Sequence, residues 1–174
     1  MRPAPREGEG GATGRGPIAA ALLVAAITGS VSGCAGLTGG GPVATNLVLA
    51  STQDDARHAA ELISRYRNAH GQGSVTFDSR LAEAAEVQAR AVAAVSSLSH
   101  GDFTGRMASF GIRGVAAENL SAGRTSIEEA IAGWKASSGH NENLLLAGIH
   151  RIGVARIDTP GAGYHEYWAL VLAQ

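Results

Sequence analysis

Apolar residues recur at helical spacing in three segments of the chain. The first segment opens at Asp54 and ends before the stretch GQG. The second has Asp78 as its expected N-cap, and its inward face is mostly alanine, which allows a neighbouring element to approach closely. The third starts at Thr125 or Ser126, where Ser126 and Glu129 have the spacing of a capping box. The pattern therefore predicts three amphipathic helices.

The period of the pattern changes towards the end of the chain. Residues 149–157 (IHRIGVARI) and 164–172 (YHEYWALVL) are rich in β-branched and aromatic side chains, and the turn-forming stretch DTPGAG separates them. They predict a terminal antiparallel hairpin, and residues 114–120 are expected to add a further strand. Because the helices precede the strands without regular alternation, the pattern favours an α+β domain of packed layers over a doubly wound parallel sheet.

The N-terminal part of the chain has a different character. Residues 17–31 are uncharged but too short for a membrane span, and they fit the apolar region of a signal peptide. This region runs into the sequence VSGC, and small residues before a cysteine resemble the lipobox of bacterial lipoprotein signals. We therefore expect residues 1–33 to be a lipoprotein-type signal peptide and Cys34 to carry the lipid. A short membrane anchor and a buried free thiol are the alternatives.

The segment after the cysteine is typical of a tether. Residues 34–53 are small, Gly-rich and mostly apolar or uncharged, and the folded domain is expected over residues 54–174. Such a signal would export the domain and anchor it to the bacterial cell envelope through the lipid on Cys34. Ala35 gives no obvious signal for retention at the inner membrane, which favours the outer membrane.

Composition and charge narrow the function classes. The chain has 174 residues, of which 45% are hydrophobic, and this is enough for one packed domain. Lys and Arg total 14 against 15 for Asp and Glu, and no basic stripe is present, which argues against a nucleic-acid binder. The single cysteine excludes an internal disulfide framework and a Cys-rich zinc site, and a thiol protease is excluded because that cysteine belongs to the signal.

Three polar residues are candidates for chemistry. His100 is expected in a loop after the second helix, Glu118 lies inside the apolar run VAAENLSAG, and His140 directly follows the third helix and its terminating Gly139. Two imidazoles and a carboxylate can hold a divalent metal such as zinc, although their spacing matches no short metal motif. The alternative is three unrelated polar residues, with Glu118 hydrogen-bonded inside the sheet.

The protonation of such a cluster depends on what it binds. Without metal, Glu118 is expected to favour the protonated forms of His100 and His140, whereas a bound metal needs both histidines neutral. A metal would therefore be lost as the pH falls below about 6. The remaining aromatic and imidazole side chains are expected to be structural or at the surface, with both tryptophans in the core: His58, His70, His150, His165, Trp134 and Trp168.

Six blocks, taken in order, resemble the CAP superfamily of cysteine-rich secretory proteins, antigen 5 and pathogenesis-related proteins, in its bacterial branch. The resemblance covers about residues 57–174. Its blocks are LISRYRNAHG, TFDSRLAEAAEVQARAVA, LSHGDF, AAENLSAG, GWKASSGHNENLLLAGIHRIGVA and YHEYWALVLAQ.

The resemblance implies an α/β/α sandwich with a central antiparallel sheet and a shallow cleft. His100, Glu118 and His140 fall on the family's first His, the Glu of its Glu-Asn pair and its second His. The family often has another Glu between the first His and this pair, but here the only acidic residue in that interval is Asp102, so the quartet is incomplete. The expected cleft residues are thus His100, Asp102, Glu118 and His140, and the two histidines are the expected metal ligands.

Three functions are compatible with these residues. The first is a lipid-anchored envelope domain whose His/Glu cleft binds a small apolar or amphiphilic ligand or a divalent ion, with no defined reaction and no required cofactor. The second is a metal-assisted hydrolase of peptides or cell-wall material, with His100 and His140 as ligands and Glu118 as general base. The third is a structural or interaction module in which the polar residues only brace the cleft.

Overall fold

A computed structural model of the protein describes residues 46–160 and 163–174, so the expected signal peptide and Cys34 lie outside the described residues. The described elements are β1 (Val48–Leu49), α1 (Gln53–Ala69), β2 (Thr76–Phe77), α2 (Ser79–Val95), α3 (Phe103–Ser109), β3 (Ala116–Ala122), α4 (Ile127–Ala136), α5 (Ser138–Leu144), β4 (Arg151–Asp158) and β5 (Glu166–Ala173). In the part of the chain that the structure describes, no helix is both long enough and apolar enough to cross a membrane.

The strands form one sheet in the order β1-β4-β5-β3, and the short strand β2 also pairs with β4. All pairs are antiparallel except that of β2 with β4. The predicted terminal hairpin is confirmed as β4 and β5, with Val154 opposite Leu170. The further strand expected over residues 114–120 is β3, which lies at one edge of the sheet.

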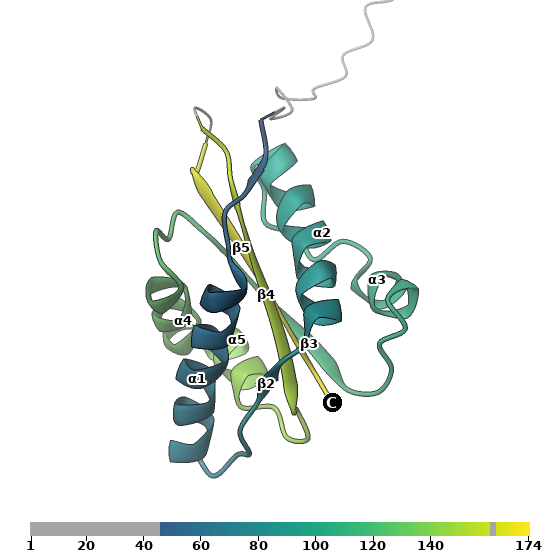
Figure 1. The fold of residues 1–174 in the computed structure, drawn as a ribbon, viewed down its shortest axis with the longest axis vertical. Coiled ribbons are helices and arrows are strands. Elements are labelled where there is room, and N and C mark those ends of the chain that lie inside the picture. The colour runs from purple at the N-terminus through teal and green to yellow at the C-terminus, as the bar shows by residue number, and fades with distance from the viewer. Residues whose placement is uncertain (1–45, 161–162) are drawn as a thin grey trace, which may run out of the picture. The chain divides into compact units, whose positions relative to one another are not determined.

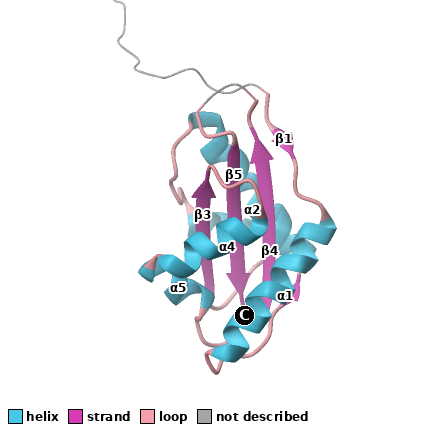
Figure 2. Ribbon diagram, turned by 90° about the vertical axis from the view of Figure 1, so that its left-hand side faces the viewer, coloured by secondary structure: helices cyan, strands magenta, loops and turns pink. Residues whose placement is uncertain are grey.

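Helices cover both faces of this sheet, which confirms the α/β/α sandwich (Figures 1 and 2). The side chains of β5 alternate between the two faces. Trp168, Leu170 and Leu172 join the cluster that includes α1, α4 and α5, whereas Tyr167 and Val171 join the cluster that includes α2 and α3. Both faces of β5 are therefore buried, which explains why its sequence is a nearly continuous apolar run.

The alanine-rich face of α2 packs closely on β4, as the sequence predicts. Its buried small residues include Ala84, Ala85 and Ala89. The approach is closest at Gly153 of β4, where an added Cβ would lie 2.0 Å from the backbone nitrogen of Ala82. Only glycine leaves room for the helix backbone at this position.

The three predicted helices are confirmed, as are the expected caps Asp78 of α2 and Ser126 of α4, whereas the cap of α1, Thr52, was not predicted. Thr52 and Asp55 form a capping box at the start of α1, Asp78 caps α2, and the Ser126 hydroxyl accepts the backbone N–H of Glu129 in α4. Their starts agree with the predicted positions within the ordinary uncertainty of helix boundaries.

Two expectations about the course of the chain are wrong. β1 lies inside the segment expected to be a tether, and it pairs with β4, so the folded part begins before Asp54. His140 was expected in a loop after Gly139, but both residues belong to α5, which starts directly after the break at Ser137. Gly139 does not terminate α4, because α4 already ends at Ala136, and Gly139 lies in the first turn of α5.

A buried arginine fixes the segment that follows α5. Arg67 of α1 is 1% exposed and donates to four carbonyl oxygens: those of Gly73 at 2.8 Å, Leu144 at 2.7 Å, Leu146 at 3.0 Å and Ile149 at 3.1 Å. Burial lowers the pKa of Arg67 below its ordinary value. The guanidinium thereby holds the end of α5 and the start of β4 against α1.

Candidate cleft at the edge of the sheet

Glu118 is the buried acidic residue at the centre of the candidate site. It lies on the edge strand β3 opposite Val171 of β5, so its side chain points to the face covered by α2 and α3. Its side chain is only 1% exposed. A buried carboxylate needs partners of positive charge or strong hydrogen-bond donors, and the structure provides one for each of its oxygens.

The first partner of Glu118 is His100, in the loop between α2 and α3. The Nδ1 atom of His100 lies 2.9 Å from Oε1 of Glu118. The imidazole is 56% exposed, so one edge of the ring contacts the buried carboxylate and the remainder faces solvent. The structure thus brings together two residues that are 18 positions apart in the sequence.

The second partner is Arg106 of α3, which pairs with Oε2 of Glu118 and is itself only 8% exposed. Arg106 also donates to the side-chain oxygen of Gln88 and, at 3.3 Å, to the backbone oxygen of His100. Gln88 in turn donates to the backbone oxygen of Ser99. These contacts fix both ends of the Glu118 pair and the loop that carries His100.

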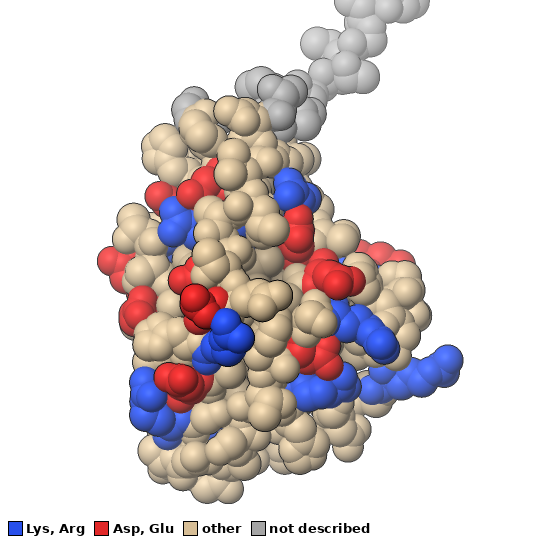
Figure 3. Space-filling model, viewed as in Figure 1, with Lys and Arg blue, Asp and Glu red and all other residues tan. Residues whose placement is uncertain are grey.

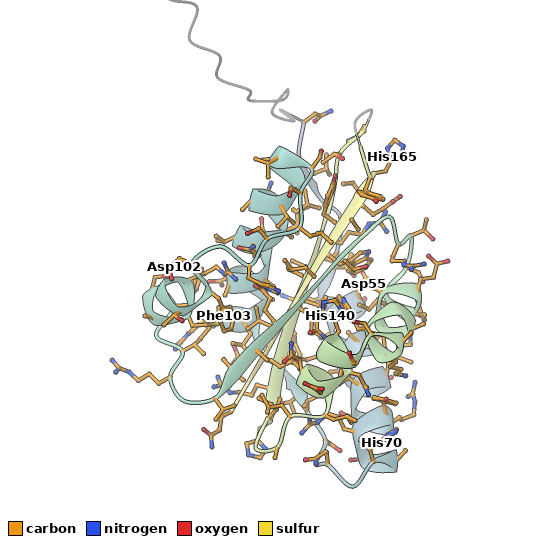
Figure 4. The ribbon with its side chains drawn as sticks, turned by 180° about the vertical axis from the view of Figure 1, so that it is seen from behind. Asp55, His70, Asp102, Phe103, His140 and His165 are labelled. Atoms are coloured by element: carbon orange, nitrogen blue, oxygen red, sulfur yellow. The ribbon has the colours of Figure 1, made fainter. Side chains whose placement is uncertain are left out.

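His140 approaches the same strand from the other face of the sheet. It lies on α5, which Asn119 of β3 holds by donating to the backbone oxygen of His140 at 3.0 Å. Asn143 of α5 donates to the Asn119 side chain at 2.9 Å and to the Glu118 backbone oxygen at 3.2 Å. Figure 4 shows His140 beside β3, between α3 and the helices of the opposite face. The two histidines therefore lie on opposite sides of the same edge strand, and besides partial burial, the proximity of His100 lowers the pKa of His140.

The pKa of His140 is shifted in the direction opposite to the one expected from the sequence. Partial burial lowers the pKa of His140 below its ordinary value, and the neighbouring His100 lowers it further. The expectation that Glu118 favours the protonated form of His140 is therefore wrong. The physical reason is that the carboxylate oxygens of Glu118 are directed at His100 and Arg106, so that among the described residues neither a hydrogen bond nor an ion pair joins Glu118 to the ring of His140.

Asp102 has a local structural task. It is the N-cap of α3, and its carboxylate accepts the backbone N–H of Gly105 at 2.8 Å. Figure 4 shows it on the α3 side of the molecule. Asp102 thereby sets the start of the helix that carries Arg106, and among the described contacts its carboxylate does not join Glu118 or His140.

The donor atoms left for a metal are two imidazole nitrogens. In the tautomer in which Nδ1 of His100 carries the proton, that N–H donates to Oε1 of Glu118, and Nε2 is the imidazole nitrogen left for a ligand. A carboxylate that holds the other nitrogen of a metal-binding histidine is a common supporting arrangement. Glu118 itself does not fit as a ligand, since a cation would lie beside Arg106. Within residues 46–160 and 163–174, no three His, Cys, Asp or Glu side chains are grouped to hold a metal ion.

Comparison with protein families gives one match over most of the folded region. The family described as CAP, the cysteine-rich secretory protein family, matches residues 60–172. The chain belongs to the CAP family. Comparison with curated protein sequences finds no match.

Solved structures of bacterial CAP-like proteins share this fold. An outer surface protein of Borrelia burgdorferi has a TM-score of 0.64 at 17% identity, with 73% of this chain and 97% of that chain covered. A cysteine-rich secretory protein from Staphylococcus aureus has a TM-score of 0.59 at 15% identity, and covers 71% of this chain. An extracellular protein with an SCP domain from Bacillus anthracis has a TM-score of 0.60 at 20% identity, and covers 70%. This chain spans 39% of the Staphylococcus chain and 41% of the Bacillus chain.

Sequence reasoning missed the residues that hold this CAP cleft together. Arg106 has no distinctive sequence pattern, because it acts through a contact with a distant segment. Asn119 and Asn143 lie in blocks of the family resemblance, but the sequence alone gave them no role, because their contacts join β3 to α5. Gln88 offered a signal, since it is a polar residue on the otherwise apolar face of α2 and is 4% exposed. A buried glutamine on such a face requires hydrogen-bond partners.

Proposed function

We propose that this CAP protein is exported and lipid-anchored in the cell envelope, and that its cleft binds a small ligand between His100 and His140. The observation that supports the cleft most directly is the His100–Glu118 contact of 2.9 Å, with Glu118 held in turn by Arg106. The buried Glu118–Arg106 pair holds the half-exposed imidazole of His100 in one orientation. One ring nitrogen is thereby kept at a fixed position, where it can form a hydrogen bond or bind a metal. No reaction is assigned to the cleft.

A divalent cation such as zinc is the simplest ligand for this arrangement. His100 offers Nε2 because Glu118 engages its Nδ1, and His140 is neutral at neutral pH because its pKa is lowered. Neutral imidazole is a common zinc ligand. Two protein ligands are fewer than the three of catalytic zinc sites, so we expect a weak site that water or a second ligand completes.

Calorimetric titration of zinc into the chain at neutral pH tests the cleft. We expect micromolar binding that is abolished in His100→Ala and in His140→Ala. His165→Ala is the matched control, because His165 lies at the far end of the β4–β5 hairpin (Figure 4) and should leave the binding unchanged. Absence of zinc binding by the unmodified chain would contradict the metal proposal, and a panel of amphiphilic ligands would then test the cleft.

The anchoring proposal rests on the VSGC sequence and not on the described residues. Two of the proteins that share this fold are an outer surface protein and an extracellular protein, which fits an exported chain. We expect the chain produced in a bacterial host to fractionate with membranes, and Cys34→Ala to release it. Cofractionation of the Cys34→Ala variant with membranes would contradict lipidation at this residue.

A metal-assisted hydrolase of peptides or cell-wall material is the second candidate. The structure favours a different base from the one expected, because Glu118 is paired with Arg106 and is not free to accept a proton. His100, oriented by Glu118, would then act as the base in place of a metal ligand, and of the two histidines only His140 would be left to bind the metal. Hydrolysis that is unchanged in both His100→Gln and His140→Ala would end this proposal.

A structural or interaction module is the third candidate. The buried Glu118–Arg106 pair would then only brace the loop and α3 against the sheet. Strong destabilisation by Glu118→Ala, together with zinc binding that does not depend on either histidine, would favour this alternative.

A further inference from the structure

One end of the molecule has exposed apolar side chains and few charges. We define the hairpin end as residues 46–49, 95–97, 159–160 and 163–165 of the described chain. The four large apolar side chains exposed here are Val48 at 46%, Leu49 at 44%, Val95 at 61% and Tyr164 at 59%. The segments are joined in space, because Val48 pairs with Asp158 at the base of the hairpin and an added Cβ on Gly163 would lie 2.9 Å from the Ser96 hydroxyl. They therefore form one surface.

The hairpin end contains no Lys, Arg, Asp or Glu in its described residues. Figure 3 shows that charged side chains begin below this end on the face it displays. The acidic residues at the base of the hairpin, Asp158 and Glu166, lie opposite each other in the β4–β5 register, and Asp158 is paired with Arg156. Burial of this surface would therefore remove apolar groups from water without stripping water from an exposed ion.

The chain that precedes the described residues joins the domain at this same end. Figures 1 and 2 show that the N-terminal side of β1 lies near the tip of the β4–β5 hairpin and near the C-terminal end of α2. Cys34 is 46 − 34 = 12 residues before the first described residue, Asn46. A Gly-rich linker of this length has a root-mean-square span of roughly 20 Å. A lipid on Cys34 would thus act on the domain through the hairpin end, where the chain enters it.

We infer that the hairpin end rests on the lipid surface when the protein is anchored. The inference rests on the lipid anchor of the proposed function. Tyrosine is enriched where proteins meet the membrane interface, since its ring is apolar and its hydroxyl reaches water. A few apolar side chains bind a bilayer weakly on their own, but the tether keeps their local concentration at the membrane high.

This placement also orients the cleft. Figure 4 shows His165 at the hairpin end and His140 farther along the molecule. With the hairpin end on the membrane, the edge of β3 that carries the cleft faces sideways and stays clear of the lipid surface. A ligand of the cleft would then arrive from the aqueous side of the envelope.

A pair of single-site labels tests the inference. The full chain is produced as a lipoprotein, in which the lipid blocks the thiol of Cys34, and a fluorophore is placed on an added cysteine in Val95→Cys or in Val115→Cys. Val95 lies at the hairpin end, and Val115 is the matched control because it is a similarly exposed valine, at 43%, whose backbone pairs with Gln174 at the C-terminus. The proteins are reconstituted into phosphatidylcholine vesicles with and without brominated acyl chains.

We expect brominated lipid to quench the label at position 95 at least twofold and to leave the label at position 115 unchanged. Tyr164→Cys provides a second label at the hairpin end, should Val95→Cys fail to fold. If the protein floats with the vesicles but the labels at positions 95 and 115 are quenched equally, the inference is overturned. The lipid anchor would still be supported by that result. Protein that does not float with the vesicles overturns the anchor, and the inference falls with it. The fluorescence of the label at position 95 could instead change with the number of protein molecules per vesicle, and do so equally without bromine. That result would show that a second copy of the protein covers this surface, and it would also overturn the inference.

Discussion

At the scale of single residues, the cleft depends on one buried ion pair. Glu118 and Arg106 are 1% and 8% exposed, so removal of the guanidinium would leave a buried carboxylate without its strongest partner. We expect Arg106→Met to lower the free energy of unfolding by about 3 kcal/mol, measured by urea denaturation. Arg90→Met is the control, because the Arg90–Glu86 pair is 39% and 30% exposed and should contribute at most about 1 kcal/mol. Equal losses in the two variants would show that the Glu118 pair is not a special support of the cleft.

The lowered pKa of His140 predicts how stability changes with pH. In the folded state His140 holds a proton less readily than in the unfolded chain, so acid favours the unfolded chain. Its contribution to stability is complete above the unfolded pKa of about 6.5 and is lost as the pH falls towards the lower pKa of the folded state. We expect His140→Gln to flatten the decline in unfolding free energy between about pH 7 and pH 5, measured in metal-free buffer. His165→Gln serves as the control, and a His140→Gln curve that parallels the unmodified protein would contradict the prediction.

At the scale of elements, the contact between α2 and β4 has no tolerance for a larger residue at Gly153. An added methyl group would lie 2.0 Å from the backbone nitrogen of Ala82, and a helix backbone can move away only by disturbing the alanine face around it. We expect Gly153→Ala to reduce stability by about 1–3 kcal/mol, seen as a lower midpoint of thermal unfolding. Gly73→Ala is the comparison, since no atom lies within 4 Å of its added Cβ, and it should be nearly neutral. A neutral Gly153→Ala would contradict the close packing of α2.

The elements also show what the sequence can and cannot reveal. α1, α2 and α4 were predictable because each has an apolar stripe and a capping residue, and β4 and β5 because β-branched and aromatic residues flank a turn. The short elements were not, since α3, α5 and the two-residue strands have too few residues for a period to appear.

The same distinction applies to the cleft. His100, Glu118 and His140 could be named from the resemblance to the CAP family, and the His100–Glu118 contact agrees with that set. Arg106 could not be named, because its importance comes from the fold bringing α3 against the edge strand. The sequence therefore identified the candidate side chains but not the residue that decides the role of Glu118.

At the scale of the whole molecule, the two edges of the sheet have different tasks. The edge formed by β3 carries the candidate site, whereas the edge formed by β4 is covered by β1 and β2 at its two ends. β1 also lines a pocket of about 200 Å³ between α1 and α2. An uncovered edge strand offers unpaired backbone groups to other chains, so β1 is expected to protect the molecule from association.

Removal of β1 tests this protection and the position where the folded unit begins. A chain that starts at Ser51 loses the pairing of Val48 and Leu49 with β4 and the hydrogen bond of 3.0 Å from Ala50 to Arg156. We expect it to be less stable by about 1–2 kcal/mol and to aggregate at lower concentration than a chain that starts at Gly39, the first residue of the compact unit. Thermal unfolding and light scattering compare the two chains. Identical behaviour would mean that residues 46–50 act only as a tether, whereas the expected loss would show that β1 closes the β4 edge of the sheet and belongs to the folded unit.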